Sequence, residues 1–209
     1  MVQYDEGDAF GENSTRCRCI QYYISRLNWR YETEEKKLSM SMASISKKKT
    51  ELKEKIGVYA VSIAIALGTG GLSALLSMGN MDLYSDIRQP LFAPPAILFP
   101  IVWTVLYILM GIGAAMIYTE ERVKKSERTA ALTPYAASLF VNFLWSLLFF
   151  NFRAFLPAFI WLVLLEFLVV MTIISYRKVN TGAAYLQIPY AIWVAFAGYL
   201  NIAIYLLNP

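Results

Sequence analysis

The sequence predicts an all-α membrane protein, a bundle of five transmembrane helices preceded by a polar segment. Its 209 residues are 57% hydrophobic and only 16% charged, whereas ordinary soluble domains are roughly 45–50% apolar and about 25% charged. The apolar residues gather in five long runs, each close to the ~20 residues that a helix needs to cross a bilayer. Most charged residues fall before or between these runs, which is typical of multi-pass membrane proteins.

The polar segment covers residues 1–55 and carries eleven Lys/Arg and nine Asp/Glu. No apolar run of signal-peptide length occurs in residues 1–40, so we expect no secretory leader. Residues 31–55 are compatible with a helix that is broken by the Ser-rich SMSMASIS, with disorder, or with translation that starts at Met40 or Met42. The composition leaves these alternatives open.

The membrane domain is expected to cover residues 56–209, with spans at about 56–79, 96–119, 133–151, 155–176 and 183–207. Glycines at positions 68, 70 and 71 of the first span favour close packing of a neighbouring helix. Prolines 90, 94, 95 and 100 fall before the second span or in its first turns, where a missing N–H costs little. Later in that span Gly111-x-x-x-Ala115 is a pair of small residues that indicates a helix contact.

Two further prolines mark helix ends. Thr133-Pro134 predicts the start of the third span as an N-cap followed by a proline. Pro189 interrupts the early part of the fifth span, where it should kink the helix or free backbone carbonyls.

The distribution of positive charge predicts the orientation. One side of the membrane would carry the polar segment and the loops at 120–132 and 177–182, with seventeen of the nineteen Lys/Arg, and the other only Arg88 and Arg153. The positive-inside rule therefore places the N-terminus in the cytoplasm and the proline-rich loop at 80–95 outside. The lysines directly before the first span indicate an anchor to the membrane surface, and they are Lys47, Lys48, Lys49, Lys53 and Lys55.

Prolines and aromatic residues form a motif over residues 84–111, at Tyr84, Ile87, Gln89, Pro90, Pro94, Pro95, Phe99, Pro100, Trp103, Leu106, Tyr107, Met110 and Gly111. Two later stretches accompany it, NFLWSLLFF at 142–150 and IPYAIWVAFAGYLNIAIYLLN at 188–208. Together they resemble the signature of the translocator protein family, also called tryptophan-rich sensory proteins or TspO/MBR, over about residues 56–208. Leu83, Gln89 and Phe92 depart from the usual Trp, basic residue and Trp of that family.

The resemblance implies an integral membrane receptor or sensor that binds protoporphyrin IX, haem-like porphyrins and related hydrophobic ligands in a cavity under the 80–95 loop. It implies porphyrin as a ligand and no required cofactor, a homodimer, and in some members sterol or benzodiazepine-type ligands, porphyrin transport or light-dependent breakdown of protoporphyrin. Trp103 and Trp193 would be the catalytic candidates for that breakdown. The expected ligand-binding residues are Tyr84, Pro94, Pro95, Trp103, Tyr107, Asn142, Trp145, Pro189, Tyr190, Trp193 and Asn201.

Two pairs of these residues carry specific expectations. Trp103 and Trp193 each lie within about two turns of a proline, so we expect both indoles at the outer end of the bundle as facing walls of one pocket. Asn142 and Asn201 are amides in apolar helices, which form either interhelical hydrogen bonds or contacts to a ligand.

Some classes of site are disfavoured. The chain has no histidine, which excludes His-ligated zinc or haem and His-based catalytic triads, and we expect no metal site. Cys17 and Cys19 are expected to be free thiols. Glu166 is the single ionisable side chain deep in a span, and such residues often mark functional sites, so a proton-coupled transporter that uses Glu166 is the alternative function.

Overall fold

The computed structural model describes residues 9–80, 84 and 87–208, with side chains from Tyr23 onward except those of Ile24 and Asn80. The chain divides into two compact units, Met1–Glu54 and Lys55–Pro209, which are described separately. All regular structure in the described residues is helical, and five helices are long and apolar enough to cross a membrane. The predicted all-α class with five spans is thereby confirmed. The thiols of Cys17 and Cys19 lie outside the described side chains.

The first unit is helical from Ala9, where helix α1 (Ala9–Ser77) begins, and the same helix continues into the second unit. The Ser-rich segment does not break the helix, contrary to one of the alternatives for residues 31–55. Ser39 and Ser44 donate their hydroxyl hydrogens to the carbonyls of Lys36 and Ser41, at 2.9 and 2.7 Å. Each hydroxyl thus bonds one turn back along the helix rather than diverting the chain into a turn.

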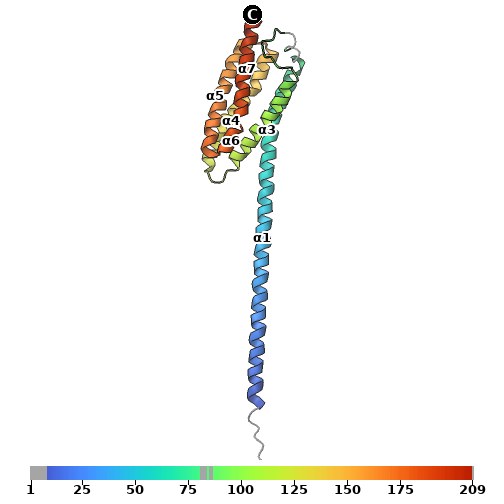
Figure 1. The fold of residues 1–209 in the computed structure, drawn as a ribbon, viewed down its shortest axis with the longest axis vertical. Coiled ribbons are helices and arrows are strands. Elements are labelled where there is room, and N and C mark those ends of the chain that lie inside the picture. Colours follow the sequence, from blue (N-terminus) through green and yellow to red (C-terminus); the bar gives the residue numbers. More distant parts are fainter. Residues whose placement is uncertain (1–8, 81–83, 85–86, 209) are drawn as a thin grey trace, which may run out of the picture. The chain divides into compact units, whose positions relative to one another are not determined.

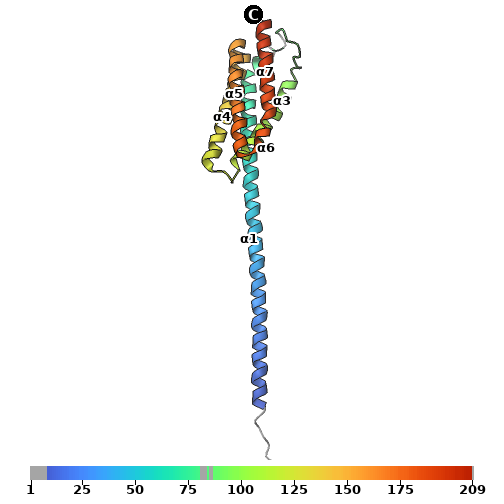
Figure 2. The same cartoon turned by 60° about the vertical axis from the view of Figure 1, so that its left-hand side comes forward.

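Among the described residues the second unit, the membrane unit, contains the last part of α1 and seven further helical elements (Figure 1). They are the 3₁₀ turn η1 (Met78–Asn80), α3 (Leu98–Tyr118), α4 (Lys125–Ser146), the π-helical turn η2 (Leu147–Asn151), α5 (Phe155–Val179), and α6 (Thr181–Tyr185) with α7 (Ile188–Leu207). α5 packs against α4 and α7 in the views of both Figure 1 and Figure 2. Successive spans run in opposite directions, so the start of α3 and the end of α7 lie toward the same face of the bundle.

The start of the third span was predicted wrongly. Helix α4 begins at Lys125, and Pro134 lies inside it. The Thr133 hydroxyl does not cap the helix; it donates to the carbonyl of Thr129, one turn earlier, at 3.1 Å. Hydropathy marks only the apolar part of a helix, and α4 begins earlier, in the polar residues before that part. The helix passes through Pro134 at the cost of one backbone hydrogen bond, because proline has no N–H to donate.

The fifth span is interrupted just before its proline. The short helix α6 ends at Tyr185, and α7 begins at Ile188 with Pro189 in its first turn, where a missing N–H is tolerated. The proline thus starts a new helix after a break of two residues, Leu186 and Gln187.

Close packing between the first two spans depends on glycine. A Cβ atom on Gly111 would lie 2.6 Å from the Cα atom of Ile63 in α1, and one on Gly70 would lie 2.0 Å from the ring of Tyr107 in α3. Of the three glycines in the first span, only Gly70 has such a neighbour; Gly68 and Gly71 have none within 4 Å.

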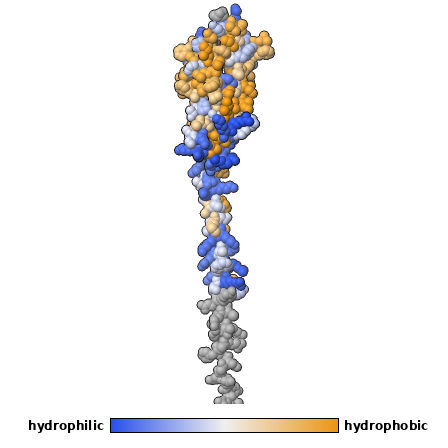
Figure 3. Space-filling model, turned by 90° about the vertical axis from the view of Figure 1, so that its left-hand side faces the viewer, coloured by the Kyte–Doolittle hydropathy of each residue, from blue (hydrophilic) through white to orange (hydrophobic). Residues whose placement is uncertain are grey.

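The outer surface of the helices in the membrane unit is largely apolar (Figure 3). On α5, Ile160, Val163 and Phe167 are all more than half exposed. An apolar surface of this kind suits acyl chains rather than water, in keeping with an integral multi-pass membrane protein.

Candidate functional site

A cavity of about 230 Å³ lies among α1, α3, α4, η2 and α7 of the membrane unit, and Tyr84 and Ala96 of the segment before α3 also line it. Six of the eleven predicted site residues line it: Tyr84, Trp103, Tyr107, Asn142, Trp145 and Asn201. None of the described lining residues carries a charge. The cavity can therefore take an uncharged, mainly apolar group.

The loop over the cavity is held to the end of α7 by hydrogen bonds. Tyr199 donates its hydroxyl hydrogen to the Leu91 carbonyl at 2.9 Å. The Asn208 side chain accepts from the Arg88 backbone N–H at 2.9 Å and donates to the Arg88 carbonyl at 3.1 Å. Phe92 has a φ of 68°, in the left-handed region, where the chain turns. These contacts hold the loop against α7.

Tyr84 connects this loop to the cavity wall. Its hydroxyl donates to the Pro94 carbonyl at 3.0 Å, and its own carbonyl accepts from the Gln89 side chain at 2.7 Å. Its ring meets Phe99 edge to face, with centroids 5.1 Å apart. Burial raises the pKa of Tyr84, so the phenol stays protonated and remains a hydrogen-bond donor.

Stacked aromatic rings form one wall of the cavity. Trp103 stacks on Tyr107 with ring centroids 5.6 Å apart and lies 6.4 Å from Trp145, which in turn lies 5.5 Å from Phe149. The pairs Trp103–Tyr107 and Trp145–Phe149 are four residues apart, so each pair projects from one face of its own helix. The wall is therefore built mainly from aromatic side chains.

The amide of Asn142 joins α4 to α3. Its Nδ2 donates to the Tyr107 hydroxyl at 2.8 Å, and Asn142 is only 2% exposed. Tyr107 reaches this position because Gly70 of α1 has no side chain to block its ring. This contact is the interhelical hydrogen bond that one of the two sequence expectations described.

The other five predicted residues do not line the cavity. Pro94 contributes its carbonyl to Tyr84, while Pro95 is exposed. Tyr190 is buried behind Trp103, with ring centroids 6.2 Å apart, and Trp193 packs on Phe99 at 5.9 Å. Pro189 lies in the first turn of α7.

Trp103 and Trp193 are therefore not facing walls of one pocket. Pro100 is in the first turn of α3 and Pro189 in the first turn of α7, and these two helix starts belong to opposite faces of the bundle. The expectation that both prolines share the outer end was wrong, because an intervening pair of spans, α4 and α5, returns the chain to the face where α3 ended. Trp145 of α4, not Trp193, accompanies Trp103 at the cavity.

Several lining residues were missed by the sequence analysis. They come from α1, from the η2 turn and from the second half of α7: Ser73, Ser77, Phe149, Phe150, Ala197, Leu200 and Ile204. On α7 the spacing of positions 197, 200, 201 and 204 follows one face of a helix, a signal that was present around Asn201. Ser73 and Ser77 also share one helix face, with Gly70 and Ala74, but it is the approach of α1 to α4, where the Ser73 hydroxyl donates to the Phe143 carbonyl at 3.2 Å, that brings this face to the cavity.

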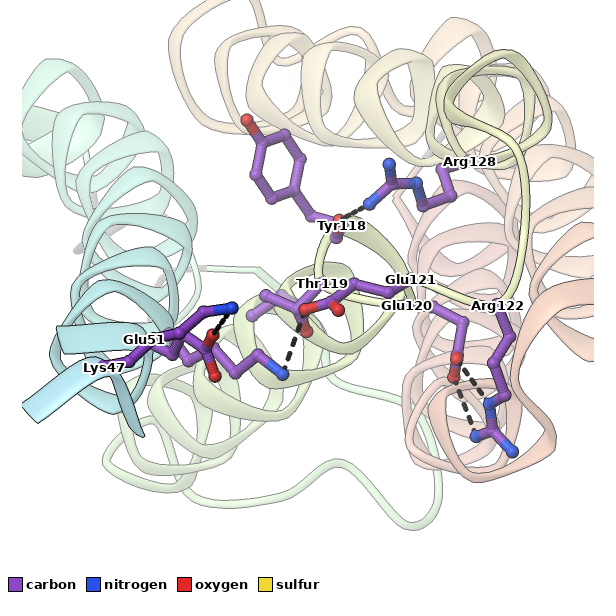
Figure 4. Close-up of polar contacts among 10 residues, drawn as sticks. Lys47, Glu51, Tyr118, Thr119, Glu120, Glu121, Arg122 and Arg128 are labelled. Atoms are coloured by element: carbon purple, nitrogen blue, oxygen red, sulfur yellow. Dashed lines mark hydrogen bonds and ion pairs between the residues drawn. The ribbon is translucent and has the colours of Figure 1, made fainter. Parts of the chain in front are cut away.

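The opposite end of the membrane unit is charged and internally paired (Figure 4). Glu120 accepts hydrogen bonds from Arg122, the closer at 2.8 Å. It also accepts one from the Asn180 amide at 3.1 Å. These two donors, Arg122 first, lower the pKa of Glu120 to about 2. Arg128 donates to the Tyr118 carbonyl at 2.6 Å, and Lys55 pairs with Glu121 at 3.2 Å. These contacts connect the loop after α3 to the neighbouring helices.

Glu166 lies on α5 and is not a lining residue of the cavity. Its side chain is half-buried, and within the part of the chain that the structure describes its Oε2 atom has no hydrogen-bond partner. The structure thus separates this carboxyl group from the aromatic cavity.

Comparison with known proteins gives a consistent result across the membrane unit. The profile of the TspO/MBR family matches residues 60–207. The chain is 34% identical over 149 residues to the tryptophan-rich protein TspO of Chlorobaculum tepidum, which covers 71% of this chain and 93% of that protein. It is 35% identical to the protein CrtK of Rhodobacter capsulatus (73% of this chain, 91% of that one) and 34% identical to the translocator protein of Bos taurus (69% and 86%). The family match begins inside α1 and ends at the last residue of α7.

Proposed function

The chain belongs to the TspO/MBR family of integral membrane proteins, and from that premise we propose that it is a receptor that binds tetrapyrroles, with protoporphyrin IX as the leading candidate. The proposed site is the cavity beneath the loop before α3. The observation that carries the proposal is the aromatic wall of Trp103, Tyr107 and Trp145 beside a space whose described lining is uncharged. A flat aromatic ring stacked there gains about 0.5–1.5 kcal/mol per aromatic pair beyond the burial of its area.

The size of the cavity bears on how such a ligand would enter. At about 230 Å³ it is smaller than the roughly 300–1,000 Å³ of typical ligand pockets, and a porphyrin macrocycle is wider than this space. We expect one edge of the macrocycle to occupy the cavity and the charged propionates to stay outside, because burial of an unpaired charge is costly. Binding would displace the loop, whose ties to α7 are the bonds of Tyr199 and Asn208.

Light-dependent breakdown of protoporphyrin is the further activity that the family resemblance suggests. If it occurs, we expect Trp103 to take part and Trp193 not to, because only Trp103 lines the cavity. The earlier pairing of the two tryptophans as catalytic candidates is replaced by Trp103 together with Trp145.

The decisive experiment is a titration of the purified full chain with protoporphyrin IX in the dark, in which binding is measured by the quenching of tryptophan fluorescence. We expect saturable quenching, because Trp103 and Trp145 line the cavity. Metal-free protoporphyrin should bind about as tightly as haem, because the sequence contains no histidine to ligate the iron. The proposal would be overturned if the quenching of the protein did not saturate and equalled the quenching of free tryptophan in solution.

We also propose that the N-terminus is cytoplasmic, with the loop before α3 outside, and that the protein forms a homodimer. The orientation rests on the excess of Lys/Arg before α1 and between α3 and α4. In a background without Cys17 and Cys19, a cysteine at exposed Leu91 should react with an impermeant thiol reagent on intact cells, and one at exposed Ser126 should not. The reverse labelling pattern would show that the orientation is inverted.

The proposed homodimer would be tested by measuring the mass of the protein in detergent.

A further inference from the structure

A second cavity, of about 390 Å³, lies at the charged end of the membrane unit. Among the described residues it shares no lining residue with the aromatic cavity, and its volume falls within the roughly 300–1,000 Å³ of typical ligand pockets. Its lining includes two cations, Lys55 and Arg122, and two anions, Glu120 and Glu121. A group that carries both a positive and a negative charge therefore suits this cavity better than a simple anion or cation.

The two ion pairs of this lining differ in how firmly they are held. Glu120, whose side chain is 10% exposed, accepts hydrogen bonds from Arg122 at 2.8 and 3.3 Å and from Asn180 at 3.1 Å. Lys55 and Glu121, with side chains 50% and 77% exposed, meet in a contact of 3.2 Å. In Figure 4 the Glu121 side chain extends toward α1, whereas that of Glu120 extends to the opposite side of the loop.

The exposure of the second pair makes it exchangeable. A solvent-exposed ion pair contributes little to stability, because water already solvates both charges well. The ammonium of Lys55 and the carboxylate of Glu121 are both accessible, so a ligand can reach them without unfolding any part of the bundle. These two side chains can therefore give up each other for partners on a ligand at small cost.

The cavity also lies where a lipid headgroup would be. Lys55 directly precedes the first apolar run, and Glu121 is in the loop after α3, so both are at ends of membrane-spanning helices. One turn into the first span is Tyr59, and in the last turn of α3 is Met116; both are half-buried and line the same cavity. The lining thus passes from charged to largely apolar side chains, as the bilayer does from headgroups to acyl chains.

We propose that this cavity binds the phosphoethanolamine headgroup of a phospholipid. The phosphate accepts from the Lys55 ammonium, and the primary ammonium of ethanolamine donates to the Glu121 carboxylate. One exposed ion pair of the protein is thereby replaced by two ion pairs to the ligand, while Glu120 and Arg122 keep their own contacts. The acyl chains continue past Tyr59 and Met116 into the bilayer. This site is independent of the proposed tetrapyrrole cavity.

The chemistry of the lining predicts which headgroups are rejected. A choline headgroup carries the same two charges, but its quaternary nitrogen has no N–H to donate to Glu121, and hydrogen bonds between charged groups are the strong ones. A glycerol headgroup has the phosphate and no cation, so it leaves Glu121 unpaired beside a second negative charge. We expect ethanolamine to be preferred over both by about tenfold, which corresponds to about 1.4 kcal/mol.

The test offers the purified, delipidated full chain three phospholipids with identical acyl chains and ethanolamine, choline or glycerol headgroups. Native mass spectrometry measures how much of each remains bound across a concentration series. We expect the ethanolamine lipid to bind about tenfold more tightly than the other two. Equal retention of all three would mean unselective annular lipid and would overturn the proposal. Tighter binding of the glycerol lipid would also overturn it, since attraction of an anionic lipid to Lys/Arg alone would then suffice.

Two variants locate the preference. Lys55→Met and Glu121→Gln each remove one charge and retain a side chain of similar length, so each should reduce the preference for ethanolamine to near parity. The matched controls are Lys178→Met and Glu127→Gln, at exposed positions that do not line the cavity, and both should keep the preference. If it persists in both cavity variants, the lipid binds elsewhere and the proposal fails. A purely structural ion pair would instead lower the melting temperature of both variants and leave the preference intact.

A soluble probe separates a lipid from a free phosphoethanolamine as the source of this chemistry. Glycerophosphoethanolamine has the same headgroup and no acyl chains. If it displaces the bound ethanolamine lipid at millimolar concentration, the headgroup alone is recognised and a soluble ligand is also accommodated. If it does not, while the lipid preference and its loss in the two variants hold, the acyl chains contribute to binding and the ligand is the lipid.

Discussion

Helices α4 and α7 each have one side that packs against another helix, here called the filled side, and one side that borders a cavity, here called the hollow side. On the filled side they pack against α5, whose Leu162, Leu165 and Val169 are at most 2% exposed. The indole N–H of Trp161 on α5 donates to the Val141 carbonyl of α4 at 2.8 Å. On the hollow side, Trp145 of α4 and Asn201 of α7 face a cavity of about 230 Å³ toward α1 and α3.

The difference indicates that folding and binding depend on opposite faces of the same helices. Dense contacts on α5 hold the bundle together, so the cavity side can leave space and unpaired polar groups without loss of the fold. Substitutions on the filled side should change stability and leave ligand affinity nearly unchanged, whereas those on the hollow side should do the reverse. The predictions on α5 and at the aromatic wall test that separation, and the prediction at the charged end concerns a region outside it.

The largest effect is expected on the filled side. Leu165→Ala removes a side chain that is 0% exposed and should lower the free energy of unfolding by about 2–5 kcal/mol, because a void replaces well-packed atoms. Unfolding in detergent measures it. Ile160→Ala on the same helix, at a position 62% exposed, is the matched control and should change stability little. If the two variants behave alike, α5 is not the packed centre of the bundle.

The next largest effect is expected at the aromatic wall. Trp103→Phe should fold normally but bind protoporphyrin IX about ten- to a hundredfold more weakly, because stacked aromatic walls are worth roughly 1–3 kcal/mol each in comparable sites. Trp193→Phe, behind Phe99, should retain affinity close to that of the parent. A dark titration of both variants checks this. Equal losses would mean that the ligand reaches Trp193 and that the hollow side is larger than the cavity described.

A smaller effect is expected at the charged end, which belongs to neither side. Because the pKa of Glu120 is lowered from 4.5 to about 2, its contribution to stability is fully present above pH ~4.5 and is lost as the pH falls toward 2. The Arg122 side chain is 86% exposed to solvent, which screens the pair, whereas that of Glu120 is only 10% exposed, so we expect the contribution of the pair to stability to be small. Melting temperatures of the parent and Arg122→Ala between those pH values should converge on acidification. A gap between them that widens would contradict the assignment.

The smallest effect is expected for Glu166→Gln. This residue is on α5, away from the cavity, so the variant should bind protoporphyrin IX with parental affinity. The amide keeps the shape of the side chain and can accept or donate one hydrogen bond, so the fold should persist. Loss of a pH-dependent flux in this variant, measured in vesicles, would instead support the alternative of a proton-coupled transporter.

Much of the protein was readable from sequence. The number of spans follows from the length of the apolar runs, because a bilayer sets the length of a helix that crosses it. Residues three or four apart share a helix face, so neighbours within one helix, such as Trp103 and Tyr107, can be recognised from spacing alone. The motif at 84–111, with the stretches at 142–150 and 188–208, correctly indicated the family.

Tertiary structure alone decided the partners of these side chains. Asn142 and Asn201 are equivalent in sequence terms, yet one bonds to Tyr107 and the other has no described partner, because partners depend on how neighbouring helices approach and rotate. The same holds for Ser77 of α1, which reaches the cavity, and for Trp193, which does not. A sequence determines the faces of each helix locally, whereas which faces meet is set by the packing of all five helices at once.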